Sequence, residues 1–481
     1  MTKLSETILK NTTKFGRKPA LLVLEDGTSF SGYSCGVDGT AFGEICFNTT
    51  LEGYLEVITD PSYAGQIVTM TYPQIGNYGV NLDDCQSAAP AMRALVVRDM
   101  CQTPSNFRSE ISLPDFLIRN KIVAIEGVDT RSLVRHIRDF GAQKAAVSTV
   151  VLDEQRLLEE VKESTSIVGQ NLVKTVSRAA ASKFDELPAS QAFAFGIPAE
   201  KKYKVVAYDC GAKLAILENL VRCGCDLTVV PWDTPAKEVL GMHPDGVFFS
   251  NGPGDPDAVE DTYVQVRELL GKLPIFGICL GHQMMSIAAG AEIEKLKYGH
   301  RGGNQPVLNL LTHRVEITSQ NHGFGCVFSS LGDLEDEYKS VEVPRGLNGS
   351  AEDLRAWVQA GVAPVVKNEK YGRIRLTHVN LNDGTAEGIQ FMDVPAFCVQ
   401  YHPEANPGPT DSHYLFTAFT RLMDGDDDYL NIDIAKDRLA GWRFGSNCVT
   451  ASAVDRKDSS PLNLSNSKKP SQESGEEVAN A

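Results

Sequence analysis

The sequence, 481 residues long, is short of several features that define common classes of protein. Its 11 cysteines include no C-x-x-C pair, and several lie inside apolar runs. This favours reduced thiols in a cytosol-like compartment and gives no indication of a metal site. No run approaches the roughly 18 apolar residues of a membrane-spanning helix, which predicts a soluble protein. A net charge of -16 argues against a nucleic-acid or anionic-membrane surface.

Two further absences concern nucleotides and targeting. The phosphate-loop pattern G-x-x-x-x-G-K-[ST] does not occur. Residues 1–18 lack the apolar segment of a secretory signal, although they carry five basic residues against one acidic. We expect a basic N-terminal arm on a cytoplasmic protein, with a mitochondrial or plastid transit segment as the alternative.

The length predicts two or three domains, and the first is rich in expected strands. Residues 19–162 contain a hairpin signal at Asp26-Gly27 between two apolar runs. A helix is expected from Thr130, which Asp129 can cap. No catalytic constellation is apparent in this region by itself.

The second half of the chain differs from the first in composition and in the order of its expected strands and helices. Residues 163–201 are dominated by Ser, Ala, Lys and Glu, so we expect an interdomain connection there. Residues 202–424 alternate strand and helix patterns, which predicts a doubly wound α/β domain with a mostly parallel sheet and ligands at the strands' carboxyl ends. Residues 425–446 are interpreted as a C-terminal extension, and residues 447–481 as a disordered tail.

Cys279 lies in the most informative stretch, I-F-G-I-C-L-G-H-Q. An apolar strand, a tight G-x-C-x-G turn and an apolar helix follow one another. Such a turn exposes a sulfur at the sheet edge, and the free N–H groups of a new helix favour a thiolate. The alternative is a buried cysteine that ends a core strand.

A thiol nucleophile needs a base, and His402 is the best placed of the nine histidines. It ends an apolar strand, and Glu404 follows two residues later, as in a base with its orienting carboxylate. The loop S-N-G-P-G-D-P at residues 250–256 also follows a strand. It is either an N–H nest for a developing oxyanion or a simple Gly/Pro turn.

These motifs together resemble the class I, triad-type glutamine amidotransferases over about residues 203–423. The matching segments are G-I-C-L-G-H-Q, N-G-P-G-D-P and H-P-E. The first half carries G-Y-L-E-V-I-T-D-P-S-Y-A-G-Q-I-V, T-Y-P-Q-I-G-N-Y-G and G-V-D-T-R-S-L-V-R-H-I-R, and it resembles the small subunit of glutamine-dependent carbamoyl phosphate synthetase. Residues 299–306 and 319–324 match the same family.

The resemblance implies a mechanism. Cys279 would attack the side-chain amide of glutamine, His402 would act as base and then as acid, and Glu404 would orient His402. A γ-glutamyl thioester would form and then be hydrolysed to glutamate. Residues implied to form the oxyanion hole or to grip glutamine are Ser62, Gly252, Gly254, Leu280, Gln283, Asn321, Gly323 and Phe324.

The resemblance also implies a partner. With no phosphate loop and no region left for an ATP-using fold, we expect no cofactor in this chain. ATP and Mg would be bound by a separate large ATP-grasp subunit, which receives ammonia through an internal tunnel and makes carbamoyl phosphate from bicarbonate. Much of residues 20–160 would face that subunit. Whether the product feeds arginine or pyrimidine synthesis stays open.

Two alternatives stay open beside this interpretation. One is a stand-alone γ-glutamyl thiol hydrolase with the same triad, and the other is a non-catalytic regulatory subunit. The chain departs from the family over residues 326–372, where the family has a short connection. We expect a surface excursion there with a helix near residues 351–359, close enough to Asn321 to affect glutamine access.

Overall fold

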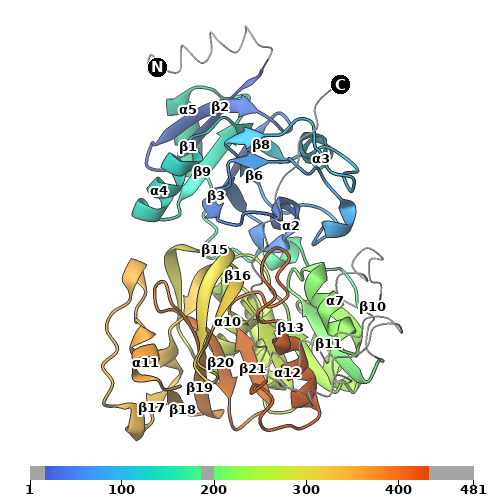
Figure 1. Cartoon of the computed structure of the whole chain (residues 1–481), viewed down its shortest axis with the longest axis vertical. Coiled ribbons are helices and arrows are strands. Elements are labelled where there is room, and N and C mark those ends of the chain that lie inside the picture. The colour runs from blue at the N-terminus through green and yellow to red at the C-terminus, as the bar shows by residue number, and fades with distance from the viewer. Residues whose placement is uncertain (1–16, 186–199, 433–481) are drawn as a thin grey trace, which may run out of the picture.

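The computed structural model describes residues 17–185 and 200–432. They form two bodies stacked along the long axis of the molecule (Figure 1). The predicted disordered tail and most of the N-terminal arm and C-terminal extension lie outside the described residues. Within the described residues, no helix is both long and apolar enough to cross a membrane.

The first body is a closed β-barrel. Its strands, in barrel order, are β1 (Pro19–Leu24), β2 (Ser29–Ser34), β8 (Val123–Glu126), β6 (Ala94–Val96), β4 (Gln66–Met70), β3 (Thr40–Asn48) and β9 (Lys144–Ser148). The hairpin predicted at Asp26-Gly27 is confirmed, because β1 and β2 pair as antiparallel neighbours. The predicted cap is also confirmed: the Asp129 carboxylate accepts a 3.0 Å bond from the N–H of Ser132 in α4 (Thr130–Phe140).

Short elements at the lower end of the barrel meet the second body (Figure 1). They are α2 (Tyr54–Thr59) and a 3₁₀ turn at Pro61–Tyr63. Asp60 caps that turn by accepting from the N–H of Ser62 at 2.8 Å. The loop D-P-S-Y is thus a turn, as its composition predicts, and it is buried against the second body.

The second body contains a 12-stranded sheet. Its main path runs through β10 (Ser182–Phe184), β12 (Cys225–Pro231), β11 (Tyr203–Asp209), β13 (Gly246–Phe249), β14 (Ile275–Ile278), β21 (Ala396–Val399), β20 (Ala386–Phe391), β19 (Gly372–Asn380), β15 (Ile293–Asn309) and β16 (Arg314–Cys326). The strands from β12 to β21 are parallel. The predicted α/β fold with a β-rich N-terminal region and a parallel central sheet is therefore confirmed. The whole sheet is mixed, because β10 at one edge and β20, β19, β15 and β16 on the other side pair antiparallel.

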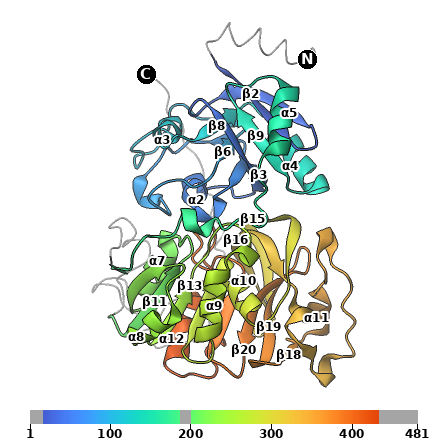
Figure 2. The same cartoon turned by 180° about the vertical axis from the view of Figure 1, so that it is seen from behind.

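Helices cover both faces of this sheet. Figure 2 shows α8 (Ala236–Gly241), α9 (Glu260–Leu269) and α10 (Leu280–Ala288) on one face, while α7 (Leu214–Arg222) and α12 (Tyr414–Met423) pack into the core on the other. The long β15–β16 hairpin leaves the sheet and reaches the barrel, where Lys295 pairs with Glu44 of β3.

Two segments carry more structure than their composition indicates. Within residues 163–201, β10 adds an antiparallel edge strand to β12, although its side chains are mostly exposed. Within residues 326–372, β17 (Asp333–Leu334) pairs with β18 (Val365–Asn368), and β18 pairs with β19. The excursion is thus built onto the sheet, and its helix α11 (Arg355–Ala360) begins four residues later than expected and buries Trp357.

Candidate active site

Cys279 and His402 come from the ends of neighbouring strands. Strands β14 and β21 pair in parallel, with Ile278 opposite Val399, so the residues that follow them emerge at the same edge of the sheet. The N–H of Cys279 donates to the carbonyl of Val399 at 2.9 Å, and the N–H of His402 donates to that of Ser319 at 2.8 Å. Both candidate catalytic side chains are almost completely buried.

The turn at Cys279 has the conformation that the G-x-C-x-G pattern predicts. Cys279 has φ 55° and ψ -103°, a strained conformation for a residue with a side chain, and it immediately precedes α10. A Cβ on Gly281 would lie 2.2 Å from the carbonyl oxygen of Phe249, and one on Gly277 would lie 2.6 Å from the sulfur of Met285. Only glycine allows strand and helix to approach so closely on both sides of the sulfur.

His402 is held by the predicted carboxylate. Its Nδ1 lies 2.7 Å from Oε1 of Glu404. Burial opposes protonation of the ring, but the charge of Glu404, with a contribution from the Cys279 sulfur, raises the pKa of His402 to about 10. The other ring nitrogen, Nε2, has no hydrogen-bond partner among the described residues, so it is available to a reacting group.

Lys213 completes this group, and the sequence analysis missed it. Its Nζ donates to Oε1 of Glu404 at 2.8 Å and to the carbonyl of Ala405 at 2.7 Å, with only 3% of the side chain exposed. Burial opposes ionisation of Glu404, but the charges of Lys213 and then His402 lower the pKa of that carboxyl to about 2. The sequence contains one indication of this role. Lys213 lies at the N-terminus of a helix, where a positive charge interacts unfavourably with the helix dipole, so a carboxylate partner is expected.

The raised pKa of His402 predicts a pH-dependent contribution to stability. The protonated ring stabilises the folded state fully below its ordinary pKa near 6.5, and this contribution is lost as the pH rises towards about 10. The thermal unfolding midpoint should therefore fall over this range in the wild type and fall less steeply in His402→Asn. Calorimetry at three pH values across the window measures both slopes; equal slopes would contradict the assignment.

The 250–256 loop brings Gly252 and Gly254 to the pocket that Cys279 lines. Gly252 packs against β11's end so tightly that a Cβ would lie 2.2 Å from the carbonyl oxygen of Cys210, and Gly254 has φ +93°. In the described part of the chain, the N–H groups of Gly252, Gly254 and Leu280 have no hydrogen-bond acceptor. They are therefore free to bind an oxyanion.

A small pocket of about 30 Å³ brings the other predicted residues together at Cys279. Of the predicted substrate-binding residues, it is lined by Ser62, Gly252, Gly254, Gln283, Asn321, Gly323 and Phe324. Leu280, which follows Cys279, does not line it. The pocket spans both bodies: the Nδ2 group of Asn251 donates to Oγ of Ser62 at 2.8 Å, and that of Asn321 donates to Oδ2 of Asp60 at 2.8 Å.

The remaining polar residues of the pocket were not predicted from the sequence. Glu44 and Gln66 reach the pocket from barrel strands β3 and β4, and Arg301 and His322 reach it from the β15–β16 hairpin. Their side chains are buried despite their polarity. Gln66, Arg301 and His322 lie in segments that match the family, but no local pattern in the sequence places their side chains beside Cys279.

Comparisons with known proteins agree with this division of the chain. The family profile described as carbamoyl-phosphate synthase small chain, CPSase domain, matches residues 22–147. The profile described as glutamine amidotransferase class-I matches residues 206–341 and 345–422.

Curated relatives match across both parts. A protein of Syntrophotalea carbinolica named carbamoyl phosphate synthase small chain is 48% identical over 406 residues, covering 84% of this chain and 98% of that protein. The protein of the same name in Thermotoga maritima is 46% identical over 409 residues, covering 84% and 98%. That of Synechocystis sp. is 45% identical over 411 residues, covering 84% and 96%. The chain therefore belongs to the family of carbamoyl phosphate synthase small chains, with a class I glutamine amidotransferase region as its second half.

Proposed function

We propose that this chain is the glutaminase subunit of carbamoyl phosphate synthetase and that Cys279, His402 and Glu404 are its catalytic triad. The observation that carries the proposal is the position of Cys279. It lies on a strained turn at the N-terminus of α10, beside the strand that leads to the buried His402–Glu404 pair. A nucleophile, a base and an orienting carboxylate in this order form an acyl-transfer site.

The first half-reaction releases ammonia. Because the pKa of His402 is raised to about 10, the proton that Cys279 gives up is held at Nε2 of His402, and the Cys279 sulfur attacks the side-chain carbonyl carbon of glutamine. The N–H groups of Leu280, Gly252 and Gly254 stabilise the negative charge that develops on the oxygen. His402 then returns its proton to the departing nitrogen, which leaves as ammonia, and a γ-glutamyl thioester remains on the sulfur.

The second half-reaction restores the enzyme. His402 takes a proton from water, which attacks the thioester carbonyl, and glutamate leaves as the sulfur regains a proton. Ser62, Gln283, Asn321, Gly323 and Phe324 hold the glutamine.

The ammonia is used by a partner. We assign carbamoyl phosphate formation from bicarbonate and ATP, with Mg, to a large ATP-grasp subunit, and no cofactor to this chain. The absence of a phosphate-loop pattern in the sequence supports this division.

A glutamine-like chloroketone tests the triad directly. We expect one covalent adduct on Cys279, prevented by excess glutamine and formed much more slowly in His402→Asn, because the base no longer activates the thiol. Peptide mass spectrometry locates the adduct. Cys85 and Cys101, which are partly exposed thiols in the barrel body, serve as internal controls. Labelling confined to such thiols, or labelling of Cys279 that glutamine does not prevent, would contradict the proposal.

A further inference from the structure

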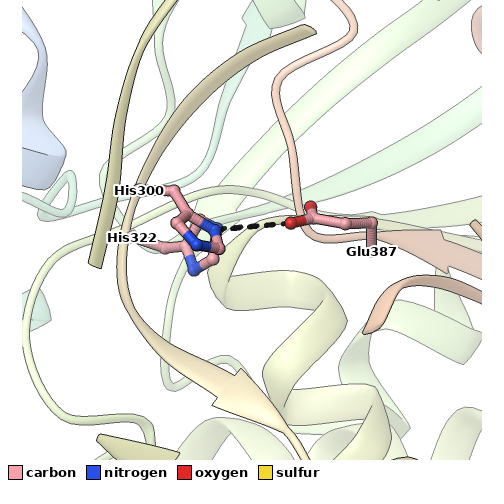
Figure 3. Close-up of side chains that lie close together, drawn as sticks. All are labelled: His300, His322 and Glu387. Atoms are coloured by element: carbon pink, nitrogen blue, oxygen red, sulfur yellow. Dashed lines mark hydrogen bonds and ion pairs between the residues drawn. The ribbon is translucent and has the colours of Figure 1, made fainter. Parts of the chain in front are cut away.

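Figure 3 shows two buried histidines, His300 and His322, close to each other beside Glu387, and His322 lines the pocket at Cys279. His300 on β15 lies directly across the strand pair from His322 on β16, and their Nδ1 and Nε2 atoms are 3.2 Å apart. Nε2 of His300 lies 2.7 Å from Oδ2 of Asp383, in the turn between β19 and β20. Glu387 of β20 approaches from the side, with Oε1 3.5 Å from Nδ1 of His300.

The hydrogen-bond partners determine where the protons lie. Nδ1 of His322 is 2.8 Å from the carbonyl oxygen of Phe324, which can only accept, so Nδ1 carries a hydrogen. Nε2 of His322 lies 3.2 Å from Nδ1 of His300 and 3.4 Å from Oε1 of Gln320. Because burial lowers the pKa of His322, its ring is neutral, and the shorter contact is the bond that Nδ1 of His300 donates to Nε2. Nε2 of His300 donates to the Asp383 carboxylate. His300 is therefore a buried imidazolium, and His322 is neutral with one defined tautomer.

The electrostatics agree with this assignment. Burial opposes the charge on His300, but hydrogen bonds and charge from Asp383 and Glu387 raise its pKa to about 10. Burial, together with the positive charge of His300, holds the pKa of His322 well below its ordinary value. The pair thus consists of a protonated ring, His300, and a neutral ring, His322, and hydrogen bonds fix the orientation of both.

The orientation of His322 matters for the pocket wall. His322 lies between Asn321 and Gly323 in sequence, and all three line the pocket at Cys279. The Phe324 carbonyl that accepts from His322 also accepts from Nε2 of Gln283 at 2.9 Å. A turned His322 ring would remove one of the two side-chain hydrogen bonds to that carbonyl and so loosen the wall formed by residues 321–324.

The turn that carries Asp383 is braced by the 326–372 excursion. The N–H of Leu354 donates to the carbonyl of Gly384 at 2.9 Å, and Nη1 of Arg355 donates to that of Asn382 at 3.0 Å. A Cβ on Gly384 would lie 2.1 Å from Oδ1 of Asp353, so the two segments are in close contact. A continuous series of contacts therefore leads from the excursion to the pocket.

We propose that His300, paired with Asp383, is a positioning residue for glutamine binding. It fixes the His322 ring, and hence the 321–324 wall, and it makes the wall's position depend on the 326–372 excursion. The inference rests on the glutaminase site proposed above. The nitrogen and carboxylate atoms of His300, His322 and Glu387 lie within 4.8 Å of one another and could also surround a metal ion. Hydrogen bonds already account for all four ring nitrogens, which favours the metal-free arrangement.

Steady-state kinetics of the complete complex test the proposal with Asp383→Asn. We expect the KM for glutamine to rise about tenfold, as loss of one charge-assisted hydrogen bond implies, with kcat changed less than about twofold. Ammonia-dependent synthesis should not change. Arg355→Ala, at the partly exposed brace, should raise the same KM by a smaller factor, and adding it to Asp383→Asn should have little further effect.

Asp393→Asn is the matched control. Its carboxylate forms an exposed pair with Arg373 in a different turn of the same sheet, and we expect no change in KM. An unchanged KM in both Asp383→Asn and Arg355→Ala would overturn the proposal. The proposal would also be overturned if the purified wild-type complex contained stoichiometric metal and the His300→Gln complex did not. Glutamine-dependent synthesis that survives loss of the Cys279 thiol would overturn the glutaminase site instead, which separates the two failures.

Discussion

Cys279→Ser is expected to lower glutamine-dependent carbamoyl phosphate synthesis by about a thousandfold or more, while ammonia-dependent synthesis continues. A serine hydroxyl has nearly the same shape but remains un-ionised beside His402, so the acyl-transfer step fails and the fold is retained. Ammonia added to the solution bypasses this step. The large subunit can then use it without the thioester.

The assay requires the assembled complex, obtained by affinity purification of the tagged chain with the large subunit that it retains. Synthesis is measured with glutamine and then with ammonium as the nitrogen source. Cys101→Ser, at a partly exposed barrel thiol, is the matched control and should behave as wild type. Loss of both activities in an intact complex would contradict a glutaminase role. Rapid glutamine hydrolysis by the chain alone would favour a stand-alone hydrolase.

Lys213→Met is expected to lower the glutamine-dependent rate by about 10- to 100-fold. It removes one charge-assisted hydrogen bond to Glu404, worth about 1.5–3 kcal/mol, in a group where the carboxylate must hold the His402 ring. Without the lysine charge, the pKa of Glu404 should rise from its value of about 2. The orienting bond to His402 then becomes weaker and less well directed.

The change should appear in kcat with glutamine and leave ammonia-dependent synthesis intact. Lys202→Met is the matched control, because Lys202 pairs with Asp424 at an exposed position on the same body. Breaking a buried pair costs about 3–5 kcal/mol, so a lower unfolding temperature should accompany the lower rate in Lys213→Met alone. A Lys213→Met enzyme with wild-type kcat would show that Glu404 needs no second partner.

The catalytic elbow could be predicted because its signal is local. Gly277 and Gly281 flank Cys279 within one strand, one turn and one helix, and the short-range geometry leaves few alternatives. The same holds for the Asp26-Gly27 hairpin and the Asp129 cap. His402 and Glu404 were found through their spacing and their place at a strand end, which the parallel pairing of β14 and β21 then explains.

Composition was less informative where tertiary contacts stabilise the structure. Residues 163–201 were predicted to be a connection, yet β10 within them extends the sheet. The strand was not predicted because an exposed edge strand has little apolar pattern. The helix expected at residues 351–359 begins at Arg355, because tertiary contacts hold the preceding residues outside a helix: the N–H of Ala351 donates to Glu294 and that of Leu354 to the carbonyl of Gly384 in the β19–β20 turn. Packing against the sheet determines both the edge strand β10 and the residue at which α11 begins.

The sequence by itself determined the fold class, the nucleophile elbow and the His402–Glu404 pair, because each depends on residues near one another along the chain. Only the tertiary structure decided that Lys213 meets Glu404, that Glu44 and Gln66 line the pocket, and that Asp383 holds His300. These contacts join residues separated by scores of positions or more. Their pairing follows from how strands and loops pack in three dimensions, and no local pattern in the sequence specifies it.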